Sequence, residues 1–213
     1  NADENQAAKV GVARNGAKRW LTAQPEKQPI ILIAGRMVPE KGILECVQAL
    51  ATVLPKFPKW HLVIAGAKRF EAARRDSYEE QIASTIAPLG NQAQMTGFIP
   101  MDEVRMWQAK AAITACPSLW DDPMPKAVLE SLAAGCALLT TRRGGIPEVA
   151  DGRAHILDTP DVTNFSAAFE KLIADDAYRQ QLQNCAWNDF PFTASAMAFN
   201  ADLQRAKCLA DAN

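Results

Sequence analysis

The sequence predicts an α/β fold, a Rossmann-like parallel sheet of about six strands flanked by helices. Short apolar runs alternate with segments of helical periodicity, the order expected for such a sheet. The first two runs are largely apolar, as in buried parallel strands, and each ends at a glycine. Hydrophobic residues make up 48% of the 213 residues and charged residues 22%, a composition typical of a globular domain.

Residues 1–29 are polar and interrupted by glycine and proline, which predicts a linker or hinge segment before a domain over 30–213. The six candidate strands are "PIILIAG" (29–35), "WHLVIAG" (60–66), "AQMTGF" (93–98), "AAITACPS" (111–118), "CALLTT" (136–141) and "RAHILD" (153–158).

Helices are predicted between these runs. Apolar residues recur from Ile43 to Leu54 at offsets of four, three and four, which indicates one helix. Asp102 is a candidate N-cap for the helix before the fourth strand. Asp122 is a candidate N-cap for the helix after that strand, with Pro123 as the first helical residue. Other candidates are 71–87, a short helix in 144–152, and helical sequence from 161 onward with a break at "NDFPF" (188–192).

Composition argues against several classes of partner. The formal net charge of −1 provides no overall basic field to attract nucleic acid or anionic lipid. No apolar run approaches the ~18–20 residues of a membrane span, and no signal peptide is apparent. The five cysteines include no Cys-x-x-Cys motif, so we expect buried free thiols and a reducing, cytoplasmic setting.

Polar residues after the first strand suggest a phosphate site, because ligands of open α/β sheets bind beyond the carboxyl ends of the strands. Gly35 permits a sharp turn, and Arg36 and Lys41 flank the start of a helix, where two cations could bind a diphosphate. The alternative is a solvated loop with a Glu40/Lys41 surface pair. Neither the dinucleotide fingerprint nor the P-loop motif occurs.

The segment after the fourth strand, "WDDPMPKAVLE" (120–130), holds two carboxylates. With Asp122 as N-cap and Pro125 still in the first turn, Asp122 and Glu130 would lie about 12 Å apart along one helix. That spacing suits the two ends of an extended ligand better than a paired acid and base. Glu130 lies among apolar residues, so it needs a partner, either ribose hydroxyls or a nearby Lys or Arg.

The segment "TTRRGGIPEV" (140–149) follows the fifth strand. Its glycines permit a close approach to a helix start, and Arg142 and Arg143 either add positive charge near a phosphate or, more commonly, face solvent. His61 and His155 have no neighbouring metal-ligand type at suitable spacing. We therefore predict structural roles for both histidines and no metal site.

Four motifs resemble, in their order and spacing, the C-terminal, donor-binding half of glycosyltransferase family 4. They are "GRMVPEKG" (35–42), "TGFIP" (96–100), "CPSLWDDPMPKAVLESLAAG" (116–135) and "GGIPEVADG" (144–152). The resemblance covers about residues 12–157, and "VARNG" (12–16) is similar to the interdomain segment of that family. It implies one half of a GT-B fold and a retaining transferase that uses a nucleotide-sugar donor without a cofactor or bound metal.

The resemblance also implies a role for each matching residue. Arg36 and Lys41 would stabilise the donor diphosphate, Asp122 would lie near the transferred sugar, and Glu130 would bind the ribose. The full implied donor site is Gly35, Arg36, Lys41, Phe98, Asp122, Met124, Pro125, Lys126 and Glu130, with Asp122, Arg36 and Lys41 as its catalytic members. Two departures affect the sugar end: an Asp replaces the usual Glu, and Pro125 has no N–H to donate.

The family resemblance leads to an expected function. We expect the nucleotide-sugar-binding C-terminal domain of a retaining hexosyltransferase, in cell-surface polysaccharide or lipopolysaccharide synthesis, where such enzymes are common. The N-terminal acceptor domain is absent from this chain, so turnover by the chain alone should be negligible, and any peripheral membrane contact would come through that domain. The alternatives are a domain of a GT-B nucleotide-sugar epimerase and a non-catalytic nucleotide-binding module.

Overall fold

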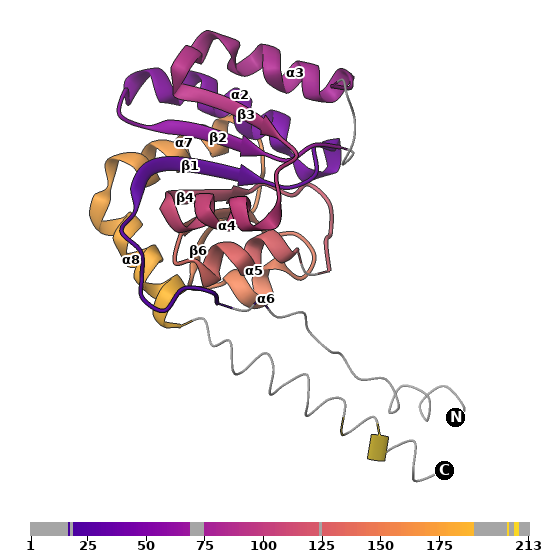
Figure 1. Ribbon diagram of the computed structural model, residues 1–213, viewed down its shortest axis with the longest axis vertical. Coiled ribbons are helices and arrows are strands. Elements are labelled where there is room, and N and C mark those ends of the chain that lie inside the picture. Colours follow the sequence, from indigo (N-terminus) through magenta and orange to yellow (C-terminus); the bar gives the residue numbers. More distant parts are fainter. Residues whose placement is uncertain are drawn as a thin grey trace.

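A computed structural model describes residues 17, 19–68, 75–123, 125–189, 204, 207 and 208. Six parallel strands form one sheet in the order β3-β2-β1-β4-β5-β6 (Figure 1). The strands are β1 Gln28–Ala34, β2 His61–Ala65, β3 Ala93–Gly97, β4 Ala111–Cys116, β5 Ala137–Thr141 and β6 Ala154–Leu157. The predicted fold class, a Rossmann-like parallel sheet flanked by helices, is confirmed.

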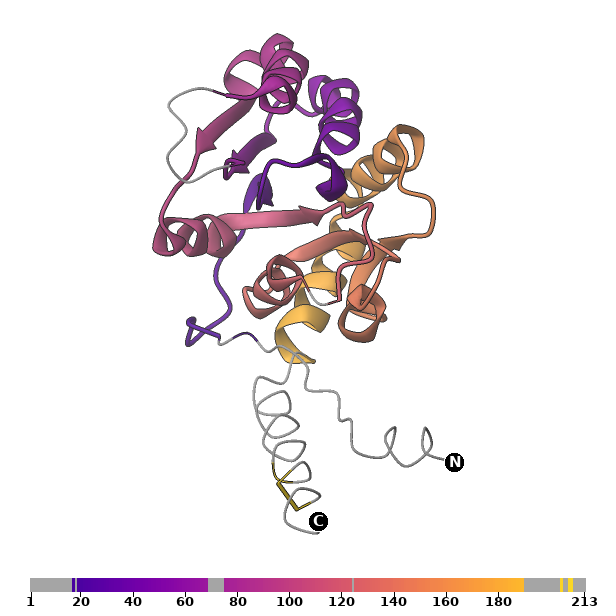
Figure 2. The ribbon, with the colours of Figure 1, turned by 90° about the vertical axis from the view of Figure 1, so that its right-hand side faces the viewer.

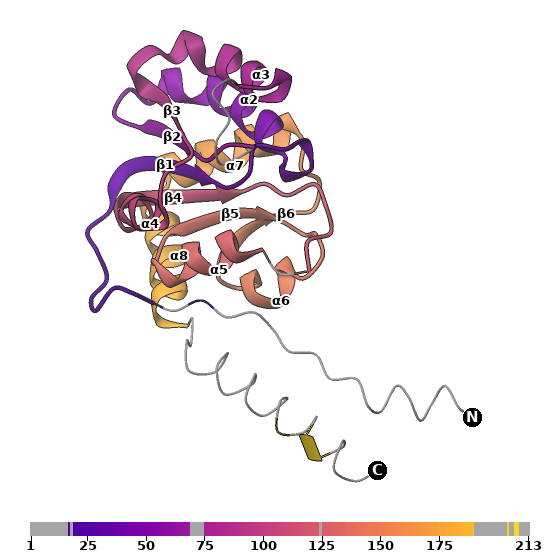
Figure 3. The same cartoon turned by 45° about the vertical axis from the view of Figure 1, so that its right-hand side comes forward.

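Helices cover both faces of the sheet (Figure 3). On one face α2, α3 and α7 pack with β1, β2 and β5 into the larger core; on the other α5 and α6 pack on β5, and α4 packs on β1. α8 contributes to the cores of both faces. The helices are α2 Ile43–Val53, α3 Ser77–Ile86, α4 Met101–Lys110, α5 Lys126–Ala133, α6 Ile146–Ala150, α7 Val162–Ala174 and α8 Asp176–Asn188, with 3-10 turns η1 Pro39–Lys41, η2 Leu54–Lys56 and η3 Ala87–Gln92.

Prolines move two helix starts away from the predicted positions. α5 begins at Lys126 with Pro125 as its N-cap, so Asp122 is neither a cap nor on the axis of this helix. α4 begins at Met101 with Pro100 as its N-cap, and Asp102 lies in the first turn. Each proline disfavours helical dihedral angles in the residue before it, so neither helix extends back past its proline. The predicted spacing of Asp122 and Glu130 along one helix was therefore wrong.

The helix predicted over 71–87 is shorter, because a capping box defines its start. The carboxylate of Asp76 accepts from the N–H groups of Tyr78 and Glu79, and the Glu79 side chain accepts from the N–H of Asp76. Glu71 lies outside the described residues. The helical sequence after 161 divides into α7 and α8 at Asp175, which was not predicted.

The cysteines and the N-terminal segment can be compared with their predictions. All five cysteines are free; Cys46 and Cys136 are buried, but Cys208 is exposed. In the described part of the chain, no helix is long and apolar enough to cross a membrane. The segment "VARNG" lies outside the described residues, and the linker role of 1–29 stays a prediction.

Two cations attach the segment before β1 to the domain. Arg19 donates to the carbonyl oxygens of Ala133 (3.0 Å) and Trp187 (2.6 Å). The Lys27 ammonium donates to the carbonyl oxygens of Gln108 (3.0 Å), Ala109 (3.1 Å) and Ala134 (2.9 Å). These carbonyls lie at the ends of α4, α5 and α8, where a cation satisfies groups that have no partner within the helix. Burial lowers the pKa of Lys27.

Candidate functional site

The arrowheads of β1 and β2 point to the right-hand side of Figure 1, which is the side that Figure 2 turns toward the viewer. Gly35 and Gly66 follow β1 and β2, and the two loops are in direct contact there. A Cβ atom on Gly66 would lie 1.9 Å from the carbonyl oxygen of Gly35, so only glycine fits. The strand order reverses between β1 and β4, which is where ligand-binding crevices of open α/β sheets form.

A cavity of about 310 Å³ occupies this crevice. Its floor comes from the ends of β1 and β4, and its charged rim comes from the loops after them. Six of the nine predicted donor-site residues line it: Gly35, Arg36, Lys41, Asp122, Pro125 and Lys126. Arg36 and Lys126 are exposed, so both cationic groups can reach a bound ligand.

Lys41 and Asp122 form an ion pair within the cavity. The Lys41 Nζ atom donates to Asp122 Oδ2 at 2.6 Å, and the two side chains are 26% and 18% exposed. The predicted alternative, a Glu40/Lys41 surface pair, does not occur among the described ion pairs. The pair keeps the ammonium pointed at the acid until a ligand with a stronger negative charge competes for it.

Contact between two loops places Lys41 beside Asp122. The N–H of Leu119, after β4, donates to the carbonyl oxygen of Glu40, after β1, at 3.0 Å. Gly42 has a φ of +64°, and a Cβ atom there would lie 2.1 Å from the carbonyl oxygen of Pro117. Glycine at position 42 is therefore required for the two loops to approach this closely.

The loop after β5 holds the acidic segment from its other side. The N–H of Gly145 donates to the carbonyl oxygen of Asp122 at 2.9 Å, and the N–H of Gly144 donates to Asp121 Oδ1 at 3.1 Å. A Cβ atom on Gly144 would lie 2.2 Å from the Asp122 oxygen. The Gly-Gly pair was predicted to permit a close approach, but its contact with Asp121 and Asp122 was not foreseen.

Glu130 lies on α5, half-buried, and does not line the cavity. Burial raises the pKa of this carboxyl, while a hydrogen bond with Gln108 and the charges of Arg105 and Lys126 act in the opposite direction. Among the described residues it makes no ion pair within 4.0 Å. A carboxylate in this state has capacity left for hydroxyl donors.

The remaining predicted residues are spread around the site. Phe98 follows β3 with 51% of its surface exposed and does not line the cavity. Met124 lies outside the described residues. The structure adds Ser118 and Cys116 to the cavity wall, and burial raises the pKa of the Cys116 thiol to about 12, so it is a neutral wall group. Their position at the end of β4 was the signal that sequence reasoning did not use.

The basic pair after β5 and the histidines stay outside the cavity. Arg142 forms exposed ion pairs with Asp158 (2.6 Å) and Asp151 (3.1 Å), which confirms the solvent-facing interpretation for it. Arg143 does not line the cavity either. His155 Nδ1 lies 3.0 Å from the hydroxyl of Tyr178, a structural contact. In the described ranges no group of three His, Cys, Asp or Glu could hold a metal ion.

Comparisons with known proteins identify relatives of this chain. Residues 16–188 match the family described as "Glycosyl transferases group 1". A putative glycosyltransferase of Bacillus subtilis (strain 168) is 32% identical over 186 residues, which are 84% of this chain and 46% of that protein. The chain spans less than half the length of the curated relatives it matches first.

Solved structures show the same fold. The C-terminal domain of a group 1 family glycosyl transferase from Francisella tularensis has a TM-score of 0.66 and 25% identity, over 77% of this chain and 84% of that domain. Anabaena HepE, solved in complex with UDP-glucose, has a TM-score of 0.66 and 18% identity, over 86% of this chain and 49% of that protein. The second likeness is evidence of the fold alone.

Proposed function

We infer that this chain, which belongs to the group 1 family of glycosyl transferases, is the nucleotide-sugar-binding half of a two-domain GT-B enzyme. The observation that carries the inference is the cavity between β1 and β4, where Arg36, Lys41 and Lys126 converge on a space of about 310 Å³. Three cations around one crevice suit a diphosphate, whose oxygens accept charge-assisted hydrogen bonds.

The chemistry proposed for the site is departure of a nucleoside diphosphate from a sugar. Negative charge grows on the leaving diphosphate as the bond to the sugar breaks, and fixed cations stabilise that charge. Arg36 and Lys41 would supply this stabilisation without a metal ion. UDP-glucose, the ligand in the solved Anabaena HepE complex, is the first donor to test.

We also propose the stereochemistry of the transfer, the roles of the two carboxylates and the cellular setting. The order of the four motifs supports assignment to glycosyltransferase family 4, and hence a retaining hexosyl transfer. Asp122 would contact the transferred sugar after the donor displaces it from Lys41, and Glu130 would accept hydrogen bonds from the ribose hydroxyls. We place the reaction in cell-surface polysaccharide or lipopolysaccharide synthesis, where such enzymes are common, and in the cytoplasm, with membrane contact through the other domain.

A domain of a nucleotide-sugar epimerase with the same GT-B fold is the second candidate. A cavity that binds a nucleoside diphosphate is expected for both functions, so nucleotide binding alone does not distinguish a transferase from an epimerase. The match to the group 1 glycosyl transferases over residues 16–188 favours the transferase. Release of free UDP in the presence of an acceptor by the full-length protein would identify a transferase, whereas sugar inversion without UDP release would identify an epimerase.

Nucleotide binding is the direct test. At 100 times its Kd, UDP should stabilise the chain by about 2.7 kcal/mol and raise its Tm by roughly 5–10 °C. Arg36→Ala and Lys41→Ala should each reduce the UDP shift, because each removes a cation from the diphosphate. Lys56→Ala is the matched control, since Lys56 is an exposed lysine paired with Glu170 away from the cavity.

GDP and ADP, tested in parallel, would identify the base. The absence of any shift with UDP, GDP and ADP would contradict a nucleotide site and favour a non-catalytic module of another kind. A full UDP shift in both the Arg36→Ala and Lys41→Ala variants would remove the diphosphate assignment.

A further inference from the structure

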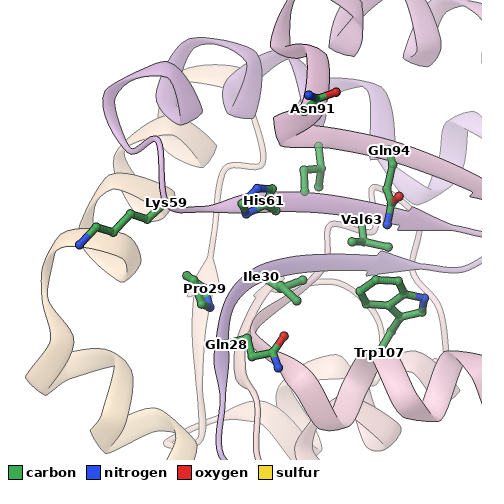
Figure 4. A pocket seen from close by; sticks show the side chains of 10 residues that line it. Gln28, Pro29, Ile30, Lys59, His61, Val63, Asn91, Gln94 and Trp107 are labelled. Carbon is green, nitrogen blue, oxygen red and sulfur yellow. The ribbon is translucent and has the colours of Figure 1, made fainter.

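A second cavity, of about 420 Å³, lies at the opposite end of β1 (Figure 4). Ile30 lines this cavity and Ile33 lines the first one, so their lining residues come within about 10 Å of each other along β1, at ~3.3 Å per residue. The two cavities have no lining residue in common. A ligand in the second cavity would therefore leave the cavity between β1 and β4 accessible.

The second cavity exists because helices leave part of one sheet face uncovered. Ile30, Val63 and Trp107 form an apolar cluster where α4 packs on β1. Farther toward the edge strand the face is open, and His61 and Gln94 are exposed there. Pairing of Ile30 with His61 and of Val63 with Gln94 places these side chains side by side on the same face.

The lining combines one indole with neutral polar groups. Trp107 of α4 points toward Val63 and Gln94, while the Lys59 side chain extends away from the other labelled residues (Figure 4). The other polar groups of the lining are Gln28, His61, Asn91 and Gln94. Within the described residues none of these four side chains makes a hydrogen bond with the protein, so their donors and acceptors are available to a ligand.

We propose that this cavity binds a neutral oligosaccharide. A sugar ring presents C–H groups on its face and hydroxyls around its edge. Trp107 is half-buried against Ile30 and Val63, with the Lys110 ammonium 5.9 Å from its ring centroid, and the exposed part of the ring offers apolar surface for the first. Amides such as Gln28 and Gln94 can both donate to and accept from the second. No carboxylate lines the cavity, and the side chain of Lys59, the one Lys or Arg in the lining, extends away from it. A charged ligand therefore has no counter-ion inside the cavity.

The size of the cavity agrees with this ligand. A volume of about 420 Å³ is within the usual range for small-molecule sites and accommodates one or two sugar units. The proposed transferase activity supplies the reason for such a site, since a bound glycan would stay near the enzyme that extends it. Only this reason rests on the proposed function; the binding itself does not.

Binding is tested on the 213-residue chain labelled with ¹⁵N, by following tryptophan indole resonances during titration with maltohexaose, cellohexaose and mannohexaose. The Trp107 indole, assigned by comparison with Trp107→Phe, should shift with at least one of them in the millimolar range. Gln94→Ala and His61→Ala should each weaken that binding about three- to tenfold, because each removes a hydrogen-bonding group. Both positions are exposed, so these variants should fold normally.

Controls separate this site from the nucleotide site. Met106→Ala changes an exposed neighbour of Trp107 on the same helix and should leave oligosaccharide binding unchanged. Arg36→Ala should weaken UDP binding and leave oligosaccharide binding unchanged, and Gln94→Ala should weaken oligosaccharide binding and leave UDP binding unchanged. No indole shift with any of the three hexasaccharides would overturn the proposal, even if UDP binds normally. An oligosaccharide affinity that is unchanged in both Gln94→Ala and His61→Ala, or indole shifts that follow a change in oligomeric state, would overturn it as well.

Discussion

Glu130 is held in a state that favours proton uptake. Burial raises its pKa above the usual value of 4.5, so the folded protein binds a proton here more readily than the unfolded chain does. The free-energy cost of the buried charge is absent below the unfolded pKa and is fully present once pH exceeds the folded pKa. Near neutral pH the carboxylate is therefore available at some cost in stability, which is common for binding residues.

Glu130→Gln should stabilise the ligand-free chain at pH 7, because the amide keeps the shape of the side chain without the buried charge. The advantage of the variant should shrink as pH is lowered through the raised pKa toward 4.5 and below. Urea unfolding of both proteins at several pH values measures this. An advantage that is constant with pH would show that the buried charge is not its cause.

The same variant should bind uridine and UDP about ten- to a hundredfold more weakly, because an amide replaces a charged acceptor of ribose hydroxyls. Calorimetric titration measures both ligands. Equal losses for uridine and UDP would place Glu130 at the nucleoside. A loss confined to UDP would contradict the ribose role, and Glu148→Gln, at an exposed glutamate on α6, is the control.

Loss of the Asp122 carboxylate should strengthen UDP binding, whereas loss of the Glu130 carboxylate should weaken it. The diphosphate must compete with Asp122 for the Lys41 ammonium, so Asp122→Asn should tighten UDP binding by up to about fivefold, the range of a partly exposed ion pair. Calorimetry with UDP tests this, with Asp121→Asn as the neighbouring control. Weaker UDP binding by Asp122→Asn would mean that Asp122 contacts the nucleotide directly.

Loop packing determines the position of the acidic segment between β4 and α5. Gly144 has a φ of +50°, and a Cβ atom on it would collide with the carbonyl oxygen of Asp122. Gly152 has a φ of +75°, but a Cβ atom on it would meet only open space. Gly152→Ala should cost about 1–2 kcal/mol for its backbone conformation alone. Gly144→Ala should cost on the order of 3 kcal/mol, because Asp122 must also move.

Chemical denaturation gives both stability losses, and UDP titration shows their effect on the cavity. Gly144→Ala should weaken UDP binding, while Gly152→Ala should not. Equal stability losses for the two variants would show that the loop after β5 yields to the extra methyl group and does not hold Asp122 in place.

All six strands are found where expected. β1, β2, β4 and β5 could be predicted because a short apolar run that is buried in the sheet is a local signal, whereas β3 and β6 are only partly buried and followed from the alternation of strands with helices. The start of α5 could not be predicted, because Asp122 and Pro125 are both candidate N-caps. Only the packing of the loop before the helix selects Pro125. Six of the fourteen residues that line the cavity were named in advance, in the donor site that the family resemblance implies. The contacts Lys41–Asp122 and Gly145–Asp122 join residues from separate loops, and only the packing of those loops brings them together.

The chain spans less than half the length of the curated relatives it matches first. Under the proposed function it supplies one side of the active-site cleft, and acceptor contacts come from the other half. The chain alone should therefore bind UDP but transfer sugar at a negligible rate. Release of UDP from UDP-glucose, with the full-length protein as reference, measures this. Rates comparable to the full-length protein would contradict the need for the second half.

Arg19 and Lys27 hold the segment before β1 against this domain. They make five hydrogen bonds to backbone carbonyls at the ends of α4, α5 and α8. Under the proposed two-domain function, residues 19–27 would move with this domain as one body when the enzyme closes on its donor. A pivot between the two halves would then lie outside 19–27, and substitutions at that pivot would alter closure while leaving the nucleotide cavity intact.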